Sequence, residues 1–357
     1  EFASANKVRV AHQGEGQGSE SIEFEDAIVA TGSRPMAVPN FEFDEERILS
    51  STGALALESV PDSMLVVGAG YIGMELSTVY AKLGTDVTVV EMLDDVLPGY
   101  EDDVKRIVRK HAEDLGVEFN FGQRASSWTV AGDDTRVTTA DEDGEEYRYD
   151  AEKVLVAVGR EPVTDTLNLE AIGLEPDEGG FLETDDRART DLETVFAVGD
   201  VAGEPMLAHK AMKEGEVAAE VAAGEPAALD YQAVPAAVFT DPEIGTVGMT
   251  EAEAEEAGFD PVVGQMPMRA SGRALTLGES DGFVRVVADD ETGFVLGAQI
   301  VGPEASELIA EFGLAIEMGA TLEDVAATIH THPTLAEATM EAAMNARGEA
   351  IHTLNRG

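Results

Sequence analysis

The chain has 357 residues, of which 44% are hydrophobic, and its 71 acidic and 23 basic residues give a formal net charge of −48. This size allows two or three globular domains. No run of about twenty apolar residues is present, so a transmembrane helix is excluded and no membrane partner is expected. The absence of cysteine excludes disulfides and thiolate chemistry within the chain.

The acidic residues are spread along the whole chain and are not gathered in one tail. At low salt such a surface repels itself, whereas molar salt shortens the screening length to about 3 Å. The composition therefore predicts a soluble protein of a halophilic cytoplasm. An acidic protein that docks a basic partner is the alternative, but its charge would be concentrated in one segment. Nucleic acid would be repelled and is not an expected partner.

The first segment predicts two strands, at residues 7–11 and 21–30, joined by a glycine-rich turn at residues 14–18. The second strand runs into Thr31-Gly32-Ser33-Arg34-Pro35, whose small residues allow a close approach by backbone or ligand. Residues 39–62 read as a connector with a short helix near residues 52–57.

Residues 64–91 predict one βαβ unit that binds a dinucleotide. An apolar strand, residues 65–67, leads into Gly68-Ala69-Gly70-Tyr71-Ile72-Gly73 and a helix, and a second strand, residues 87–90, ends at Glu91. The first glycine permits a tight turn, the second lets the backbone approach a pyrophosphate at the helix N-terminus, and the third allows close helix packing. Glu91 can accept hydrogen bonds from ribose hydroxyls and would repel a 2′-phosphate, which favours NAD over NADP. A plain βαβ turn without a ligand is the alternative.

Further along, the pattern predicts a helix at residues 100–115, β structure at 117–129 and 136–139, and a hairpin turn at Asp143-Gly144. A strand at residues 154–158 then ends in Gly159-Arg160-Glu161-Pro162, which repeats the motif of residues 31–35. This repetition predicts two similar domains that each close with the motif.

The last part of the chain changes character. A strand at residues 194–198 ends in Gly199-Asp200 and is followed by a helix at residues 208–223. From residue 235 onward we expect an α+β domain with strands near residues 237 and 247 and at 283–287 and 295–301, and helices at 251–257, 306–318 and 335–347.

Acid–base chemistry concentrates in the segment Ile329 to Glu337. Pro333 biases His332 toward an extended conformation and suits the first turn of the following helix. Glu337 would then lie near enough to hydrogen-bond one ring nitrogen, leaving the other free to take a proton. Two incidental histidines at a helix start are the alternative. A metal site is incomplete, because His-x-His lacks a third nearby ligand.

Taken in order, these segments resemble the dihydrolipoamide dehydrogenases of the flavoprotein disulfide reductase family. The resemblance rests on seven motifs spread over nearly the whole chain: Ala30-Thr31-Gly32, Gly68 to Glu75, Val158-Gly159-Arg160, Ala197-Val198-Gly199-Asp200, Met206-Leu207-Ala208-His209-Lys210, Phe239-Thr240-Asp241-Pro242-Glu243, and His330-Thr331-His332-Pro333-Thr334.

The resemblance implies an α/β fold of FAD- and NAD(P)-binding Rossmann-like domains with a carboxy-terminal α+β dimerisation domain. Residues 1–40 would end the FAD-binding domain, 41–160 would bind NAD, 161–232 would complete the FAD site, and 233–357 would form the dimer interface. It assigns to FAD the residues Ala30, Thr31, Gly32, Asp200, Met206, Leu207, Ala208 and His209. It assigns to NAD the residues Gly68, Ala69, Gly70, Tyr71, Ile72, Gly73, Met74, Glu75, Glu91, Ala125 and Gly159.

The resemblance also makes His332 the proton acceptor and Glu337 its orienting acid, in a homodimer that oxidises dihydrolipoamide or a lipoyl-bearing protein. The family's FAD fingerprint and its Cys-x4-Cys are not found in the sequence. Together with a start at Glu1 in place of methionine, this predicts that an amino-terminal part with the redox cysteines precedes the chain. The alternatives are a reductase of low-molecular-weight disulfides or of mercuric ion, and a non-catalytic nucleotide-binding subunit.

Overall fold

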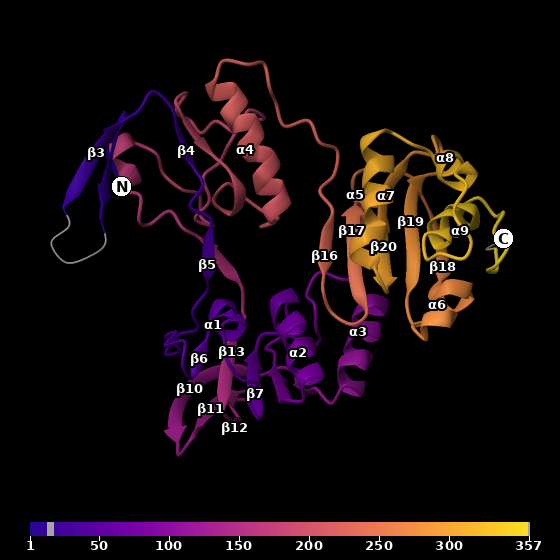
Figure 1. The fold of residues 1–357 in the computed structure, drawn as a ribbon, viewed down its shortest axis with the longest axis horizontal. Helices are drawn as coiled ribbons and strands as arrows, with labels where there is room; N and C mark the ends of the chain where they lie inside the picture. Colours follow the sequence, from indigo (N-terminus) through magenta and orange to yellow (C-terminus); the bar gives the residue numbers. More distant parts are fainter. Residues whose placement is uncertain (13–17, 356–357) are drawn as a thin grey trace. The chain divides into compact units, whose positions relative to one another are not determined.

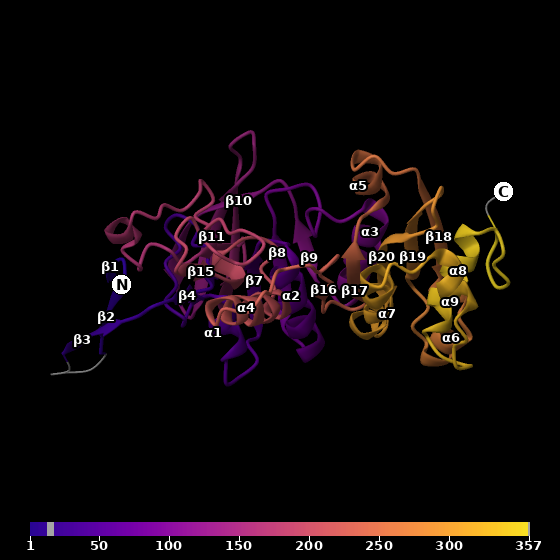
Figure 2. The same ribbon diagram turned by 90° about the horizontal axis from the view of Figure 1, so that it is seen from above.

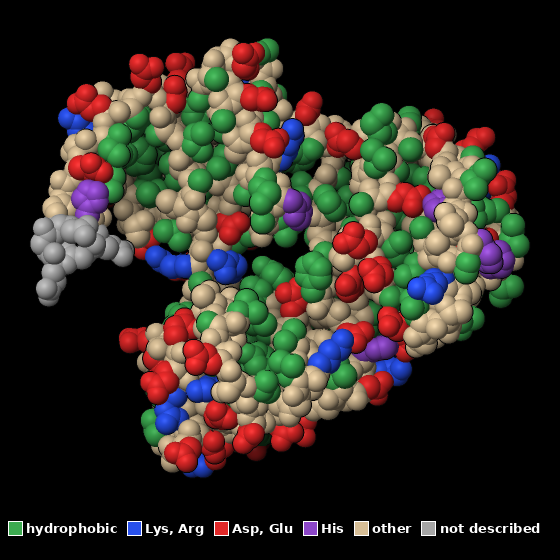
Figure 3. All heavy atoms as spheres, viewed as in Figure 1, with side chains coloured by type: hydrophobic (Ala, Val, Ile, Leu, Met, Phe, Trp, Pro, Cys, Tyr) green, Lys and Arg blue, Asp and Glu red, His purple; other side chains and the backbone are tan. Residues whose placement is uncertain are grey.

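The computed structural model describes residues 1–12 and 18–355, which form two compact units. Unit 1 combines residues 1–36 with 159–231, and unit 2 combines residues 37–158 with 232–357. Of the glycine-rich turn predicted at residues 14–18, all but Gly18 lies outside the described residues. Figure 1 follows the chain through both units by colour, and Figure 3 shows carboxylates distributed over the visible face.

Unit 1 contains a three-stranded antiparallel sheet and two short strand pairs among its described residues. The sheet has the order β1-β2-β3, β4 pairs with β15 in parallel, and β5 pairs with β14 antiparallel. The elements are β1 (Phe2–Ser4), β2 (Lys7–Ala11), β3 (Ser19–Glu23), β4 (Ala27–Val29), β5 (Ser33–Pro35), β14 (Arg160–Pro162), the 3-10 helices η1 (Leu169–Ile172) and η2 (Gly199–Val201), β15 (Val195–Ala197) and α4 (Ala208–Ala222).

The single strand predicted at residues 21–30 is wrong. β3 ends at Glu23, where the amide of Phe24 turns to donate to the Asn6 carbonyl at 3.0 Å, and β4 begins at Ala27. The two strands belong to different sheets, since β3 pairs with β2 whereas β4 pairs with β15. The acidic pair Glu25-Asp26 stands at this break and interrupts the apolar residues of the two strands.

The two copies of the repeated glycine–arginine–proline motif pair with each other. Arg34 lies opposite Glu161 in the β5–β14 ladder, and the amide of Met36 donates to the Gly159 carbonyl at 3.0 Å. Arg34 also binds Glu161 at 2.7 Å and Asp165 through two bonds of 3.0 Å. The repeat therefore forms one two-stranded element inside unit 1, at the points where the chain leaves this unit and returns to it.

The first half of unit 2 is built on a five-stranded parallel sheet of order β6-β13-β7-β8-β9, with an antiparallel meander β10-β11-β12 beside it. The elements are β6 (Ile48–Leu49), α1 (Ser51–Leu55), β7 (Ser63–Val67), α2 (Tyr71–Leu83), β8 (Asp86–Val90), α3 (Asp102–Asp114), β9 (Glu118–Asn120), β10 (Arg124–Ala131), β11 (Asp134–Ala140), β12 (Glu146–Ala151) and β13 (Lys153–Val156).

Strand β7 is buried on both faces, as expected for a strand inside a parallel sheet. Met64 and Val66 join the core cluster that includes α2 and α3, whereas Leu65 and Val67 join the cluster that includes the meander. The predicted βαβ unit is confirmed as a local structure: strand, glycine-rich turn, helix and second strand follow in the expected order.

The second half of unit 2 is an antiparallel sheet of order β16-β17-β20-β19-β18 with helices packed on it, and Figures 1 and 2 both show α7 and α9 against its strands. The sheet's Val238, Ile244, Phe283 and Val301 belong to the same core cluster as β7 and α2. The elements are β16 (Ala236–Val238), β17 (Glu243–Gly248), α5 (Glu251–Glu256), β18 (Pro261–Pro267), the 3-10 helix η3 (Met268–Ala270), α6 (Gly272–Leu277), β19 (Phe283–Asp289), β20 (Val295–Gly302), α7 (Ala305–Glu317), α8 (Leu322–Ala327) and α9 (Glu337–Ala346).

Two helices and one strand of this sheet region, α6, α8 and β18, had not been predicted. α8 begins with a capping box, in which Thr321 and Asp324 satisfy each other's backbone amides. Within the described residues, no helix is long and apolar enough to cross a bilayer.

Candidate functional site

The turn between β7 and α2 is packed so tightly that two of its glycines leave no room for a side chain. A Cβ atom at Gly68, where φ is +105°, would lie 2.4 Å from the carbonyl oxygen of Ala157, and one at Gly73 would lie 2.0 Å from that of Gly68. At Gly70, by contrast, nothing lies within 4 Å of the Cβ position. The open space is thus at the N-terminus of α2, where a pyrophosphate could approach the backbone.

Glu91 lies at the end of β8 and holds this turn. Its side chain is buried, and its two carboxylate oxygens accept from the amides of Ala69 at 2.7 Å and Leu93 at 2.9 Å. A carboxylate oxygen has two lone pairs, so both oxygens keep acceptor capacity for a ribose hydroxyl. The structure brings Glu91 next to the glycine-rich turn, as the dinucleotide prediction requires.

The other residues predicted for NAD are divided between surface and core. Tyr71 begins α2 and is 44% exposed, whereas Ala69 and Met74 are fully buried and Ile72 is half-buried. Ala125, in β10, is buried. Gly159 belongs to the second segment of unit 1.

Glu75 lies one turn further along α2. Burial raises the pKa of its carboxyl, opposed by the hydrogen bond from the Phe239 amide at 2.8 Å. This bond ties α2 to the chain just after β16. Lys82 at the other end of α2 binds Asp241 at 2.6 Å, so two contacts attach the helix to the Phe239–Glu243 motif.

The residues predicted for FAD lie in unit 1. Ser33 donates a short hydrogen bond to Asp200 and accepts one from Nε of Arg160 at 2.7 Å. Arg160 also donates to the Ser33 carbonyl at 2.8 Å. One arginine therefore fixes the serine that orients Asp200, a connection between residues far apart in sequence that sequence reasoning missed.

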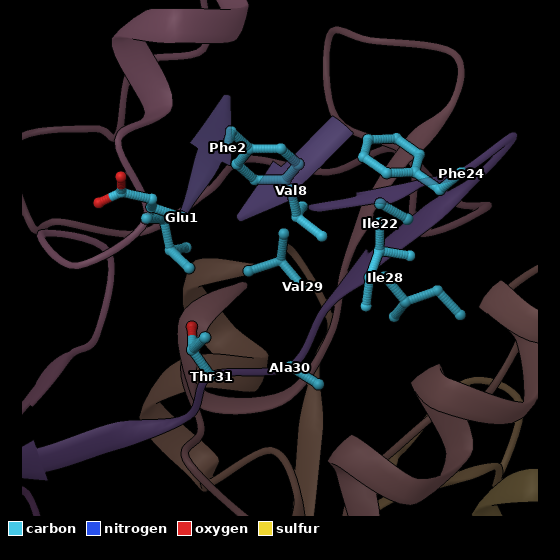
Figure 4. A pocket seen from close by; sticks show the side chains of 11 residues that line it. Glu1, Phe2, Val8, Ile22, Phe24, Ile28, Val29, Ala30 and Thr31 are labelled. Carbon is cyan, nitrogen blue, oxygen red and sulfur yellow. The ribbon is translucent and has the colours of Figure 1, made fainter. Parts of the chain in front are cut away.

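Ala30 and Thr31 line an apolar cavity of about 330 Å³ beside β4. Figure 4 shows the side chains of Phe2, Val8, Ile22 and Val29 gathered in this cavity, with Ala30 and Thr31 at its rim. Thr31 donates to the Val163 carbonyl at 2.6 Å. At Gly32, φ is +69° and the Cβ position is open.

The N-terminus of α4 follows the predicted FAD residues Met206 and Leu207. Helix α4 starts at Ala208, followed by His209, and no side chain caps its first turn, which leaves backbone donors available for an anionic or carbonyl group. Lys210 and Glu214 form a buried ion pair at 2.7 Å, and Glu214 also accepts from the Gly199 amide at 2.7 Å. The open donors at the N-terminus of α4 and the oriented Asp200 fit the polar groups of a flavin nucleotide.

His332 and Glu337 are brought together as predicted. Nδ1 of His332 lies 2.9 Å from Oε1 of Glu337, whose other oxygen accepts from the Thr334 amide at 2.9 Å. Burial by itself would raise the pKa of Glu337. The hydrogen bond from the Thr334 amide and the contact with His332 outweigh burial and hold this pKa below its usual value. The His332 side chain is 81% exposed, and no described residue bonds its Nε2.

The expected position of Pro333 in the first helical turn is wrong. Helix α9 begins only at Glu337, and the His332–Pro333 peptide bond is cis. Thr334 donates from Oγ1 to the Thr331 carbonyl at 2.7 Å, which closes a tight turn ahead of the helix. Glu337 is therefore the first helical residue and not part of a later turn.

The partner of the other histidine, His330, is not apparent from the sequence. Nε2 of His330 lies 2.8 Å from Oε1 of Glu311 in α7, and the His330 side chain is 7% exposed. The two residues are 19 positions apart, so no local pattern connects them. Among residues 1–12 and 18–355, no group of three or more His, Cys, Asp or Glu could hold a metal ion.

Comparison with known families agrees with this arrangement. Residues 2–215 match the family described as pyridine nucleotide-disulphide oxidoreductase, and residues 234–343 match the dimerisation domain of the same family. The chain therefore belongs to the pyridine nucleotide-disulphide oxidoreductase family, which confirms the predicted family and fold class.

Among sequences, the chain is 71% identical over 356 residues to a dihydrolipoyl dehydrogenase of Halobacterium salinarum and 72% identical over 353 residues to dihydrolipoyl dehydrogenase 2 of Haloarcula marismortui. These matches span 100% and 99% of this chain and 75% of each relative. Among solved structures, it is similar to LpdA from Mycobacterium tuberculosis, with 31% identity, a TM-score of 0.86 and coverage of 96% of this chain and 74% of that one.

Proposed function

We propose that this chain carries the NAD-binding, dimerisation and proton-accepting parts of a dihydrolipoamide dehydrogenase. The overall reaction converts dihydrolipoamide and NAD⁺ to lipoamide, NADH and H⁺. The observation that carries the proposal is the His332–Glu337 pair, a base with a free and exposed Nε2, in a chain about 70% identical to dihydrolipoyl dehydrogenases over its length. These relatives support this function and not the alternative disulfide or mercuric reductases.

In this proposal Glu337 keeps the Nδ1 proton of His332 in place, so Nε2 presents its lone pair to a thiol of the substrate. When Nε2 takes the thiol proton, the imidazolium that forms is stabilised by the Glu337 carboxylate 2.9 Å away. A thiolate is the form that attacks a disulfide. The sequence contains no cysteine, so the disulfide of this reaction lies outside these 357 residues.

The two nucleotides would be held by separate units. In unit 2 the open backbone at Gly70 would accommodate the pyrophosphate of NAD and Glu91 would accept from its ribose, while Tyr71 and Glu75 would serve the nicotinamide end. In unit 1 Asp200, Thr31 and the first turn of α4 would hold FAD. When bound, FAD supplies the electron transfer from dithiol to NAD.

The dimerisation domain at residues 234–343 supports a homodimer. A lipoyl-bearing protein is the proposed macromolecular substrate, and the cytoplasm of a halophilic organism is the proposed location, since relatives that are 70–72% identical come from halophilic archaea.

Replacement of His332 by glutamine tests the base. In the FAD-loaded enzyme at molar KCl, we expect kcat for dihydrolipoamide oxidation to fall by about 10² to 10⁴ fold. FAD content and NADH oxidation by an artificial electron acceptor should be unchanged, because neither needs a proton from the dithiol. The matched control is His111→Gln, because His111 lies on α3 and is paired with Asp281. This variant should retain wild-type turnover. Wild-type turnover in the His332 variant would refute the proposed role.

Glu91→Gln tests the NAD site. The amide keeps one acceptor oxygen but removes the charge that repels a 2′-phosphate, so the preference for NAD over NADP should fall by about tenfold, or about 1.4 kcal/mol. The ratio of kcat/KM for the two nucleotides measures this effect, with Glu118→Gln on neighbouring β9 as the control. An unchanged ratio would remove Glu91 from the ribose site.

A further inference from the structure

The segment between α8 and α9, residues 328–336, carries His332 but has little regular structure. Ile329 is 96% exposed and the His332 side chain is 81% exposed. The side chain of His330 differs from both, because only 7% of its surface is exposed. His330 is therefore the point at which this part of the segment enters the protein interior.

Both ring nitrogens of His330 face acceptors. Nδ1 lies 2.9 Å from the carbonyl oxygen of Thr328, which can only accept, so Nδ1 carries a hydrogen. Nε2 lies 2.8 Å from Oε1 of Glu311 and 3.3 Å from Oγ1 of Thr339. Both ring nitrogens of His330 are therefore held by hydrogen-bond partners.

Glu311 connects this pair to a third element. Its second oxygen, Oε2, accepts from Oγ1 of Thr339 at 3.0 Å, and Thr339 is fully buried. Glu311 belongs to α7 and Thr339 to α9. The hydrogen-bond network of His330, Glu311 and Thr339 therefore joins the segment, α7 and α9.

The network lies next to the His332–Glu337 pair in the chain, and this position indicates what it does. His330 is two residues before His332 in the segment, and Thr339 is two residues after Glu337 in α9. The network consequently fixes the backbone on both sides of the His332–Glu337 contact. A base displaced by about 1 Å can lose about a hundredfold in rate, so such fixing matters for proton transfer.

We propose that His330 and Glu311 are positioning residues for proton transfer, which hold His332 at its working distance through their hydrogen bond and through Thr339. This inference rests on the proposed function of His332 as the base. His330 does not touch the substrate in this scheme, and it acts only through the backbone of the segment and through α9.

Three variants of the FAD-loaded enzyme test this inference at molar KCl. His330→Leu removes both ring contacts at similar volume, and we expect kcat for dihydrolipoamide oxidation to fall by about 10 to 100 fold with KM for NAD unchanged. Glu311→Ala should lower kcat to a similar extent. Glu311→Gln should stay within about threefold of wild type, because its amide N–H can donate to Nε2 of a neutral His330.

The double variant His330→Leu with His332→Gln separates positioning from an independent effect. If His330 acts through His332, the double variant is no slower than His332→Gln alone. A multiplicative further loss would overturn the inference, as would wild-type kcat in His330→Leu. Equal losses in Glu311→Gln and Glu311→Ala would also overturn it, because a merely structural carboxylate would not be rescued by an amide.

Two further comparisons guard against a general loss of folding or of FAD. His111→Leu removes a histidine–aspartate pair on α3 and should leave kcat unchanged. Should His330→Leu lose FAD or melt earlier, the comparison of Glu311→Ala with Glu311→Gln decides. Wild-type turnover in His332→Gln contradicts the proposed function itself, whereas a crippled His332→Gln with a silent His330→Leu contradicts only the positioning role.

Discussion

Strands β7 and β4 are similar in sequence but differ in their surroundings. Both are short apolar parallel strands that lead into a glycine-containing turn assigned to a nucleotide. β7 has a parallel neighbour on each side, β13 and β8, and its Met64, Leu65, Val66 and Val67 are all buried. β4 pairs with β15 on one side, and among the described residues no strand pairs with its other edge.

The difference shows that the neighbours of a strand, more than its sequence, decide how far it is buried. Ile28 in β4 is 41% exposed and lines the apolar cavity of unit 1, whereas Val66 in β7 is fully buried. Parallel sheets are stable when both faces are covered. The NAD half of the proposed enzyme is therefore a closed structure within this chain, while the FAD residues lie beside an open strand edge.

Replacing Val66 and Ile28 by asparagine should give the largest difference in stability between the two strands. Val66→Asn should destabilise unit 2 by about 4 kcal/mol, since it buries an unpaired amide and loses apolar contact. Ile28→Asn should cost less than about 1 kcal/mol, because the side chain already meets solvent. Thermal unfolding of both variants at equal KCl measures the difference. Equal losses would contradict the exposure of Ile28, and the contrast would be broken.

Alanine at Gly73 and at Gly32 sharpens the comparison of the two turns. Gly73→Ala forces a methyl group to within 2.0 Å of the Gly68 carbonyl oxygen, so we expect a loss of about 3 kcal/mol and weaker NAD binding. Gly32→Ala meets open space, and its cost is about 1 kcal/mol from the left-handed φ of +69°. Calorimetric NAD titration and unfolding distinguish the two. An intact NAD affinity in Gly73→Ala would show that α2 can shift without loss.

The smallest effect concerns Glu75, whose pKa is raised by burial. Because the folded state disfavours the ionised carboxyl, the stability that Glu75 contributes is greatest at low pH and falls as pH rises through its raised pKa. Glu75→Gln should therefore raise the melting temperature at pH 7 but not at pH 4, with Glu113→Gln on α3 as an exposed control. The same shift at both pH values would contradict the role of charge.

The βαβ unit could be predicted because its signals are local. Gly68, Gly70 and Gly73 stand at fixed spacing between two apolar strands, and each strand was expected within two residues of its observed bounds. The pairing of His332 with Glu337 was predictable for the same reason, since five positions separate them.

The remainder depends on contacts between distant parts of the chain. Arg160 reaches Ser33 across 127 positions, and no pattern in the sequence announces that contact. Glu25-Asp26 marks the break between β3 and β4, but the change of sheet depends on pairing with β2 and β15, which lie elsewhere in the chain. Helix α9 begins two residues later than expected, after the turn in which Oγ1 of Thr334 donates to the Thr331 carbonyl.

The pairing of β5 with β14 has a consequence for how the chain could be rearranged. Met36 and Gly159 are hydrogen-bonded partners at the open end of this ladder, and residues 37–158 run between them. The two strands thus form a ready hairpin stem whose loop happens to be an entire nucleotide-binding fold. A tight turn of a few residues has the geometry to close the same stem, so β5 and β14 would keep each other as partners without residues 37–158, whereas residues 232–357 would lose the core that they share with that segment.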